Sequence, residues 1–160
     1  MASEIERSFL VPVLPSVDEL GPGARLRQGY LAFDGQVEVR VRLSDGDARL
    51  TVKAGRGLHR TEVEVVLPPP DAEELWLLTE GRRVEKVRHR TDLPSGEVAE
   101  VDVYEGPLAG LVTVEVEFAS EDDAHAFAPP AWFGRDVTTE PGWSNADLAV
   151  HGLPSSADAR

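Results

Sequence analysis

Charged residues that recur at every second position constrain the fold of this chain more than any other feature of its sequence. Glu4 and Glu6 flank Ile5, and Arg40 and Arg42 alternate with valines. Because successive side chains of a β-strand point to opposite faces, this period of two predicts strands with one charged and one apolar face. The other charged members of the pattern are Glu38, Arg49, Lys53, Arg60, Glu62, Glu64, Lys86, Arg88, Arg90, Glu100, Asp102, Glu115 and Glu117.

Eight strands are predicted, at about 3–11, 25–33, 37–43, 48–54, 60–67, 83–91, 98–104 and 112–118. Short connectors rich in Gly, Asp, Ser and Pro separate many of them and indicate antiparallel hairpins. Four helices are expected at 16–20, 71–80, 120–128 and 144–151, outside the strands or across one end of them. We therefore expect a mainly β (α+β) fold, with one domain over residues 1–153 and a disordered tail over residues 154–160.

Two arrangements of such strands are compatible with the pattern. In the first, a sheet packs its apolar face on a core and exposes its charged face to water. In the second, the strands close into a barrel whose apolar faces pack outward on helices and whose charged faces surround a wet interior. The carboxylate pairs at 4/6, 62/64 and 115/117 favour the barrel. Residues i and i+2 lie about 7 Å apart on one strand face, where like charges repel unless a cation lies between them.

Composition narrows the classes of partner. The formal net charge of -13 argues against nucleic acid and anionic membranes, because both would be repelled by the average surface. The sequence contains no cysteine, which excludes disulfides and a thiolate nucleophile and agrees with a cytoplasmic location. It also has no apolar leader and no uncharged run of about 18 residues, so a soluble protein is expected. The choice between monomer and homodimer stays open.

Short motifs follow one another in a fixed order along most of the chain. The first is Glu4-x-Glu6-x-Ser8, and the second is Gln28-Gly29-Tyr30. They are followed by Val39-Arg40-Val41-Arg42, Thr51-Val52-Lys53, Arg60-Thr61-Glu62-Val63-Glu64, Glu85-Lys86-Val87-Arg88, Val101-Asp102-Val103-Tyr104, Val114-Glu115-Val116-Glu117 and Trp143-Ser144-Asn145-Ala146-Asp147-Leu148. In this order the motifs resemble those of the CYTH domains, also called triphosphate tunnel metalloenzymes. The resemblance runs from Glu4 to about Gly152.

The resemblance implies an eight-stranded antiparallel barrel, a requirement for Mg²⁺ or Mn²⁺, and a small-molecule substrate that carries a triphosphate. Substrates in this family include inorganic triphosphate, nucleoside triphosphates, thiamine triphosphate and, in the class IV adenylyl cyclases, ATP. Because one fold supports several activities, the fold alone does not choose among them.

The basic residues of the alternating pattern are candidates for binding phosphate. A triphosphate carries about four negative charges, so a site that excludes bulk water must supply comparable positive charge. Guanidiniums bind phosphoryl oxygens with two donors each, and lysines add compact charges. The predicted clamp consists of Arg40, Arg42, Lys53, Arg60, Lys86 and Arg88. In the alternative interpretation, these side chains only neutralise neighbouring glutamates in a structural lattice of ion pairs.

The carboxylates of the pattern are candidates for binding a metal, because Mg²⁺ and Mn²⁺ prefer oxygen ligands. The predicted metal ligands, which are also the expected catalytic residues, are Glu4, Glu6, Glu115 and Glu117. Candidates for a second metal, or for orienting the clamp arginines, are Glu62, Glu64 and Asp102. The sequence thus leads us to expect a metal-dependent triphosphatase, a phosphoric anhydride hydrolase acting on inorganic triphosphate or a related triphosphate.

One position departs from the family pattern. The lysine that closes the N-terminal signature is Ser8 here, on the same strand face as Glu4 and Glu6, whereas Arg7 points to the other face. Two alternatives therefore stay open beside hydrolysis of inorganic triphosphate. The chain is either a nucleoside-triphosphate hydrolase or cyclase of a specialised pathway, or a protein that binds triphosphate or polyphosphate with weak turnover.

The three tryptophans have a simpler interpretation. Trp76, Trp132 and Trp143 lie outside the predicted strands and are expected to be packing anchors.

Overall fold

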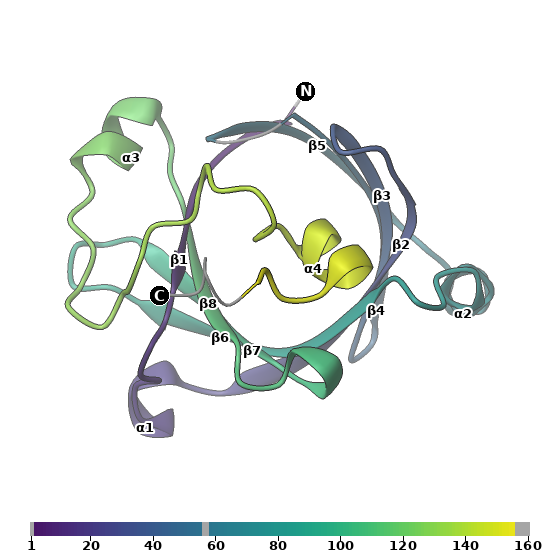
Figure 1. The fold of residues 1–160 in the computed structure, drawn as a ribbon, viewed down its shortest axis with the longest axis horizontal. Helices are drawn as coiled ribbons and strands as arrows, with labels where there is room; N and C mark the ends of the chain where they lie inside the picture. Colours follow the sequence, from purple (N-terminus) through teal and green to yellow (C-terminus); the bar gives the residue numbers. More distant parts are fainter. Residues whose placement is uncertain (1, 56–57, 156–160) are drawn as a thin grey trace.

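The computed structural model describes residues 2–55 and 58–155, and its strands form one closed antiparallel barrel (Figure 1). The order of strands around the barrel is β1-β5-β4-β3-β2-β6-β7-β8. Their bounds are β1 Ala2–Leu10, β2 Gly23–Phe33, β3 Val37–Ser44, β4 Asp47–Ala54, β5 His59–Val66, β6 Arg83–Asp92, β7 Val98–Tyr104 and β8 Val112–Glu117. All eight predicted strands are confirmed to within about two residues, and the closed barrel replaces the open-sheet alternative.

The helices are short and were predicted less accurately. They are α1 Val17–Leu20, α2 Pro69–Leu77, α3 Glu121–Ala126 and α4 Asn145–His151, with a 3-10 turn at Gly106–Leu108. Helix α2 begins at Pro69, two residues before the predicted start, because proline is tolerated in the first turn, where its missing N–H would have no helical partner. It also ends three residues before the predicted position 80.

The apolar strand faces point outward and are partly covered by helices. Val41 and Leu43 of β3 pack with Ala48 of β4 against Ala72 and Trp76 of α2. On the other side of the barrel, outward residues of β1, β7 and β8 form the largest apolar cluster with α1, α3 and the following loop. Burying these faces outside the ring of strands leaves the charged faces inside, as the barrel alternative predicted.

Helix α4 lies within the ring of strands in Figure 1 and closes one end of the barrel. Its Leu148 is 2% exposed and packs against Val84, Tyr104 and Leu108. These contacts form a small apolar cluster. Helix α4 therefore packs in the barrel through Leu148, while its first residue, Asn145, lines the charged chamber.

The segment that leads to α4 is hydrogen-bonded to β1. Beyond Ile5, β1 no longer pairs with β5, and residues 134–138 take the place of β5. Gly134 N donates to Leu10 O at 2.7 Å, and Val137 N donates to Ser8 O at 2.8 Å. This pairing brings the following segment to the chamber, where Val137, Thr138, Trp143 and Asn145 are among the lining residues.

Two further findings concern the chain as a whole. Over the described ranges, the structure contains no helix that is long and apolar enough to cross a membrane. Most of the predicted tail at 154–160 lies outside the described residues, which end at 155.

Candidate active site

The charged chamber is a cavity of about 1170 Å³ to which all eight strands contribute side chains. Its polar lining is unusual for a cavity of this size, because ligand pockets are ordinarily lined mostly by apolar groups. Among the described residues that line it, twelve carry carboxylates and six carry cationic groups. A polyanion would therefore bind here only together with further cations.

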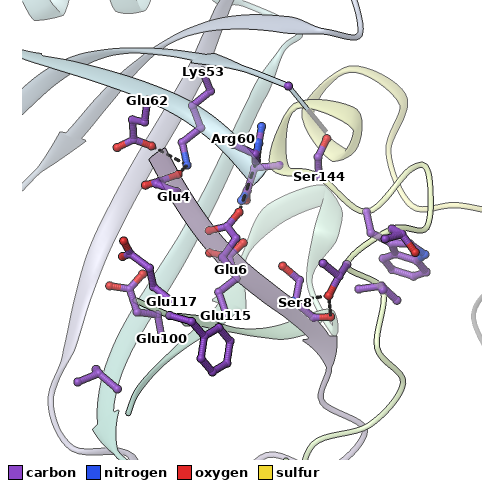
Figure 2. A pocket seen from close by; sticks show the side chains of 18 of the residues that line it. Glu4, Glu6, Ser8, Lys53, Arg60, Glu62, Glu100, Glu115, Glu117 and Ser144 are labelled. Atoms are coloured by element: carbon purple, nitrogen blue, oxygen red, sulfur yellow. Dashed lines mark hydrogen bonds and ion pairs between the residues drawn. The ribbon is translucent and has the colours of Figure 1, made fainter. Parts of the chain in front are cut away.

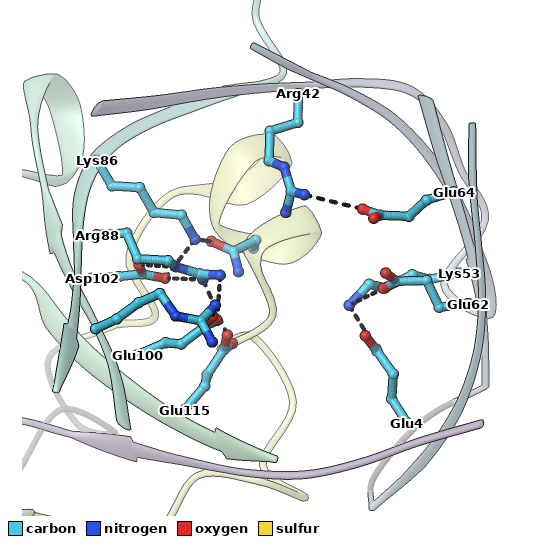
Figure 3. A network of polar contacts seen from close by, with 12 residues as sticks. Glu4, Arg42, Lys53, Glu62, Glu64, Lys86, Arg88, Glu100, Asp102 and Glu115 are labelled. Carbon is cyan, nitrogen blue, oxygen red and sulfur yellow. Dashed lines mark hydrogen bonds and ion pairs between the residues drawn. The ribbon is translucent and has the colours of Figure 1, made fainter. Parts of the chain in front are cut away.

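Cationic side chains project into the chamber from opposite walls. Arg40, Arg42, Lys53 and Arg60 come from β3, β4 and β5. Arg88 comes from β6, and Figure 3 shows it across the interior from Lys53. Arg40 is only 6% exposed and Lys53 only 7%. Five of the six predicted clamp residues thus line one cavity, an arrangement that a triphosphate chain between the walls requires.

Three cations on the β3–β5 wall, Arg42, Lys53 and Arg60, form ion pairs with carboxylates. Arg42 Nη2 lies 3.1 Å from Glu64 Oε1, and Lys53 Nζ lies 2.9 Å from Glu4 Oε2 and 2.7 Å from Glu62 Oε2. These contacts fix the side-chain directions (Figure 3). They also show that Glu62 and Glu64, the second-metal candidates on this wall, neutralise cations in the structure described here.

The sixth predicted clamp residue, Lys86, is not among the described residues that line the cavity. Its ammonium is fully buried and lies 2.6 Å from Asp102 Oδ2. Arg88 binds both oxygens of Asp102, with Nε and Nη2 each at 2.7 Å. Burial lowers the pKa of Lys86 to about 8, although Asp102 opposes the shift. Burial alone would raise the pKa of Asp102, but Arg88 and Lys86 hold it well below its usual range. Lys86 and Asp102 therefore act as buried supports of Arg88.

Carboxylates gather on the wall formed by β1 and β8 (Figure 2). The register places Glu6 opposite Glu117 and Ser8 opposite Glu115, and all four residues line the cavity. Burial and the nearby Glu115 raise the pKa of Glu6 to about 7, although Lys53 and Arg60 oppose them. A carboxylate whose charge is so poorly compensated is a suitable ligand for a divalent cation.

The geometry also limits how a metal could bind. Among the described residues, no three carboxylate or histidine side chains are already grouped as a metal cage. Mg²⁺ ordinarily takes one or two protein carboxylates together with water and phosphate oxygens, so the oxygen donors of Glu6, Glu115 and Glu117 fit an ion of that kind. Three of the predicted ligands also form ion pairs: Glu4 with Lys53 at 2.9 Å, Glu6 with Arg60 at 3.5 Å and Glu115 with Arg88 at 3.3 Å.

Ser8 lies at the edge of the charged zone. Its backbone N donates to Thr138 Oγ1 at 3.0 Å, and its side chain lines the cavity on the same face as Glu4 and Glu6 (Figure 2). Arg7 points outward, where its guanidinium binds Asp136 and the carbonyl of Ala124. The predicted departure at position 8 thus leaves a hydroxyl where the family pattern has a cation.

The sequence analysis assigned no site role to some residues of the chamber. Glu38 and Asn145 line the cavity, and Tyr30 lies fully buried beside Glu38 and Arg40. Burial, with a contribution from Glu38, raises the pKa of Tyr30 to about 12. Trp143, predicted to be only a packing anchor, also lines the cavity. The strand alternation pointed to Glu38, but nothing local in the sequence indicated that the segment after residue 134 enters the barrel.

The fold and the chamber together define a class of protein, an antiparallel barrel whose interior is a charged binding tunnel closed at one end.

No family model matches the chain. Two relatives, however, match it over almost their whole lengths. The chain is 46% identical over 149 residues to the inorganic triphosphatase of Nitrosomonas europaea, covering 92% of this chain and 97% of the relative. It is 37% identical over 150 residues to the inorganic triphosphatase of Acetivibrio thermocellus, covering 92% and 94%. The chain belongs to the inorganic triphosphatases of the CYTH, or triphosphate tunnel metalloenzyme, family.

Solved structures agree with this assignment. The crystal structure of an inorganic triphosphatase superposes with a TM-score of 0.71 at 41% identity, covering 96% of this chain and 99% of that one. A Pyrococcus horikoshii protein, 17% identical, superposes with a TM-score of 0.55 over 77% of this chain and 84% of its own. At that identity the second match supports the fold alone.

Proposed function

We propose that the chain hydrolyses inorganic triphosphate, or a closely related triphosphate, to diphosphate and phosphate with the help of Mg²⁺ or Mn²⁺. The observation that carries the proposal is the chamber itself, in which arginines on facing walls are combined with a surplus of carboxylates. The 46% identity to an inorganic triphosphatase supports the same reaction.

The chain's own residues would bind and orient the substrate. Arg40, Arg42 and Arg60 on one side and Arg88 on the other would bind phosphoryl oxygens and keep the chain extended between them. Because Arg60, Arg42 and Arg88 are already held by Glu38, Glu64 and Asp102, respectively, these three side chains have little freedom left to lose when substrate binds. The clamp is thus preorganised for a charged transition state.

Glu6, Glu115 and Glu117 would hold the divalent ion, with Glu4 as a further ligand once Lys53 turns toward phosphate. Such an ion, when bound, neutralises phosphoryl charge and lowers the pKa of a water molecule. The excess of carboxylates over cations in the lining supports this assignment, since the chamber without added cations would repel a polyanion.

A substrate panel tests the proposal. Purified protein is incubated with Mg²⁺ or Mn²⁺ and inorganic triphosphate, ATP, GTP or thiamine triphosphate, and the products are identified. We expect equal amounts of phosphate and diphosphate from inorganic triphosphate, at a kcat/KM well above those of the other substrates. Absence of products from all four would contradict the proposal.

A second candidate rests on Ser8. Without a lysine at this position, Ser8 contributes a small uncharged side chain beside Thr138, which could leave room for an organic group attached to the triphosphate. Preferential turnover of a nucleoside or thiamine triphosphate in the same panel would favour this candidate, and a cyclic nucleotide product would identify a cyclase.

A further inference from the structure

The amide of Asn145 occupies a particular position at the closed end of the chamber. Asn145 is the first residue of α4, and it lines the cavity. Its Oδ1 accepts hydrogen bonds from Tyr104 Oη at 2.7 Å and from Lys86 Nζ at 3.0 Å. Both donors come from the barrel wall, so these contacts attach the helix to the charged lining.

The two contacts determine which way the amide faces. An ammonium group can only donate, so the Asn145 atom that faces Lys86 must be the oxygen. The oxygen is used twice, and neither hydrogen bond involves the amide nitrogen. Nδ2 with its two N–H donors therefore points away from Lys86 and Tyr104, and the residue that carries it lines the chamber.

The surroundings make this nitrogen a strong donor. Lys86 is fully buried and also bound to Asp102, so its ammonium cannot easily turn to water. A charged and a hydroxyl donor on the same carbonyl oxygen polarise the amide and strengthen its N–H groups as donors. Asp102 also binds Arg88, which places the guanidinium of Arg88 and the amide of Asn145 in one connected network.

We infer that Asn145 Nδ2 is a neutral phosphate ligand, which binds the terminal phosphoryl group of the substrate at the closed end of the chamber. The inference rests on the proposed function and deepens it. Arg42 and Arg88 would neutralise this phosphoryl group from two sides, and Asn145 would bind it from α4. An unsubstituted terminal phosphate fits such a dead end, whereas any longer chain or attached group must extend toward the open mouth.

The sequence offers an unusually clear direct test, because Asn145 is the single asparagine among the 160 residues. Protein labelled with ¹⁵N only at asparagine has one side-chain NH₂ signal. Calorimetry first establishes binding of Mg²⁺ and a triphosphate analogue whose bridging oxygens are replaced by nitrogen. We expect the NMR signals of the Asn145 side-chain protons to move downfield as the analogue is added. This shift should saturate at the analogue concentration that saturates binding in the calorimetry. Unchanged side-chain protons under saturating analogue would overturn the inference while leaving the proposed function intact.

Substitutions provide an independent test. Asn145→Asp keeps an oxygen for Lys86 and Tyr104 but replaces the two N–H donors by a second carboxylate oxygen, so analogue affinity should decrease about tenfold or more. The matched control is Gln36→Glu, which makes the same change of amide to carboxylate at the mouth of the cavity and should alter affinity less than about threefold.

Thermal unfolding separates binding from structure. Asn145→Asp should retain the parent's melting temperature, whereas Asn145→Ala, which loses both accepted hydrogen bonds, should melt lower. Parent-like affinity in a folded Asn145→Asp variant would overturn the inference and leave Asn145 as a structural contact only. If the parent protein itself fails to bind the analogue, the proposed function is contradicted and the inference falls with it.

Discussion

At the scale of single residues, the strand alternation identified most of the chamber and could not identify the rest. Every second residue of a strand faces the interior, so Arg40, Arg42 and Glu62 could be assigned from sequence. How deep a side chain lies depends on the tilt of the strands and on what closes the barrel. For that reason Lys86 could not be recognised as a buried support for Arg88, nor Asn145 as part of the lining.

Arg42 provides a test of the clamp with a close control. Arg42→Ala removes a cavity-lining guanidinium bound to Glu64, and a charged hydrogen bond contributes about 1.5 to 3 kcal/mol. We expect the apparent KM for triphosphate to rise roughly tenfold to a hundredfold. Arg49 also binds Glu64 but does not line the cavity in the described structure, so Arg49→Ala should leave KM close to the parent value. Equal effects of the two changes would mean that the ion-pair lattice is structural.

Ser8→Lys tests the departure from the family signature. A lysine at position 8 would project into the cavity beside Glu6 and opposite Glu115, within reach of bound phosphate. If inorganic triphosphate is the substrate, its kcat/KM should rise by up to about tenfold to a hundredfold, the equivalent of one charge-assisted contact. If Ser8 makes room for an organic group, the variant should instead lose activity toward the organic triphosphate. Identical rates on both substrates would show that position 8 does not reach the phosphates.

Glu6 links the charge of the chamber to stability. The pKa of Glu6 is raised from 4.5 to about 7 in the folded protein. Between these pH values the folded protein therefore retains a proton on Glu6 that the unfolded chain releases. Stability in chelator should therefore decrease as pH rises from about 4.5 to 7, by at most about 3 kcal/mol from this group. The Glu6→Gln variant cannot ionise at this position. Near pH 4 it should unfold at the same denaturant concentration as the parent, and near pH 8 it should unfold at a higher denaturant concentration than the parent. A difference in unfolding midpoint between variant and parent that does not change with pH would contradict the raised pKa of Glu6.

At the scale of elements, the strands were predictable because each carries its own periodic pattern, whereas the sequence left open whether α4 packs outside the strands or across one end of them. The sequence predicted a helix near 144–151, and Ser144 caps it by accepting from Asp147 N. Its location inside the barrel depends on residues 134–138 pairing with β1, a contact between segments almost 130 residues apart. The β1 pattern itself contains no signal that a distant loop replaces β5 at this edge.

Leu148→Ala tests whether α4 packs in the barrel. Leu148 is buried among Val84, Tyr104 and Leu108, and removing a buried leucine side chain costs about 2 to 5 kcal/mol. We expect a marked decrease in the free energy of unfolding from denaturant titration. Val150 lies on the same helix at 36% exposure, so Val150→Ala should cost far less. A small effect of Leu148→Ala would mean that the helix does not dock in the barrel in solution.

At the scale of the whole molecule, the apolar and charged faces are arranged opposite to those of an ordinary globular protein, with charge inside and apolar groups under the outer helices. The interior carries more carboxylates than cations, so the barrel binds a polyanion only with the help of further cations. Only part of this excess could be anticipated from the strand pattern, because Glu97, Asp123, Glu140 and Asp147 of the lining lie outside the strands.

Removal of divalent metal should therefore abolish activity. In chelator, hydrolysis of triphosphate should cease, and it should return with Mg²⁺ or Mn²⁺. Glu117→Gln, which lacks one cavity-lining carboxylate charge, should need a higher metal concentration for half-maximal rate. Full turnover in chelator would rule out the metal-dependent mechanism, and unchanged metal dependence in Glu117→Gln would remove this residue from the ligand set.

The most direct measurement of the central claim is a crystal structure of the protein with Mn²⁺ and the nitrogen-bridged triphosphate analogue. The account predicts an anomalous peak for Mn²⁺ against Glu6, Glu115 or Glu117. It also predicts that the three phosphoryl groups lie between Arg42 and Arg88 inside the barrel. An analogue bound on the outer surface of the barrel, or a chamber that stays empty at saturating analogue and Mn²⁺, would contradict it.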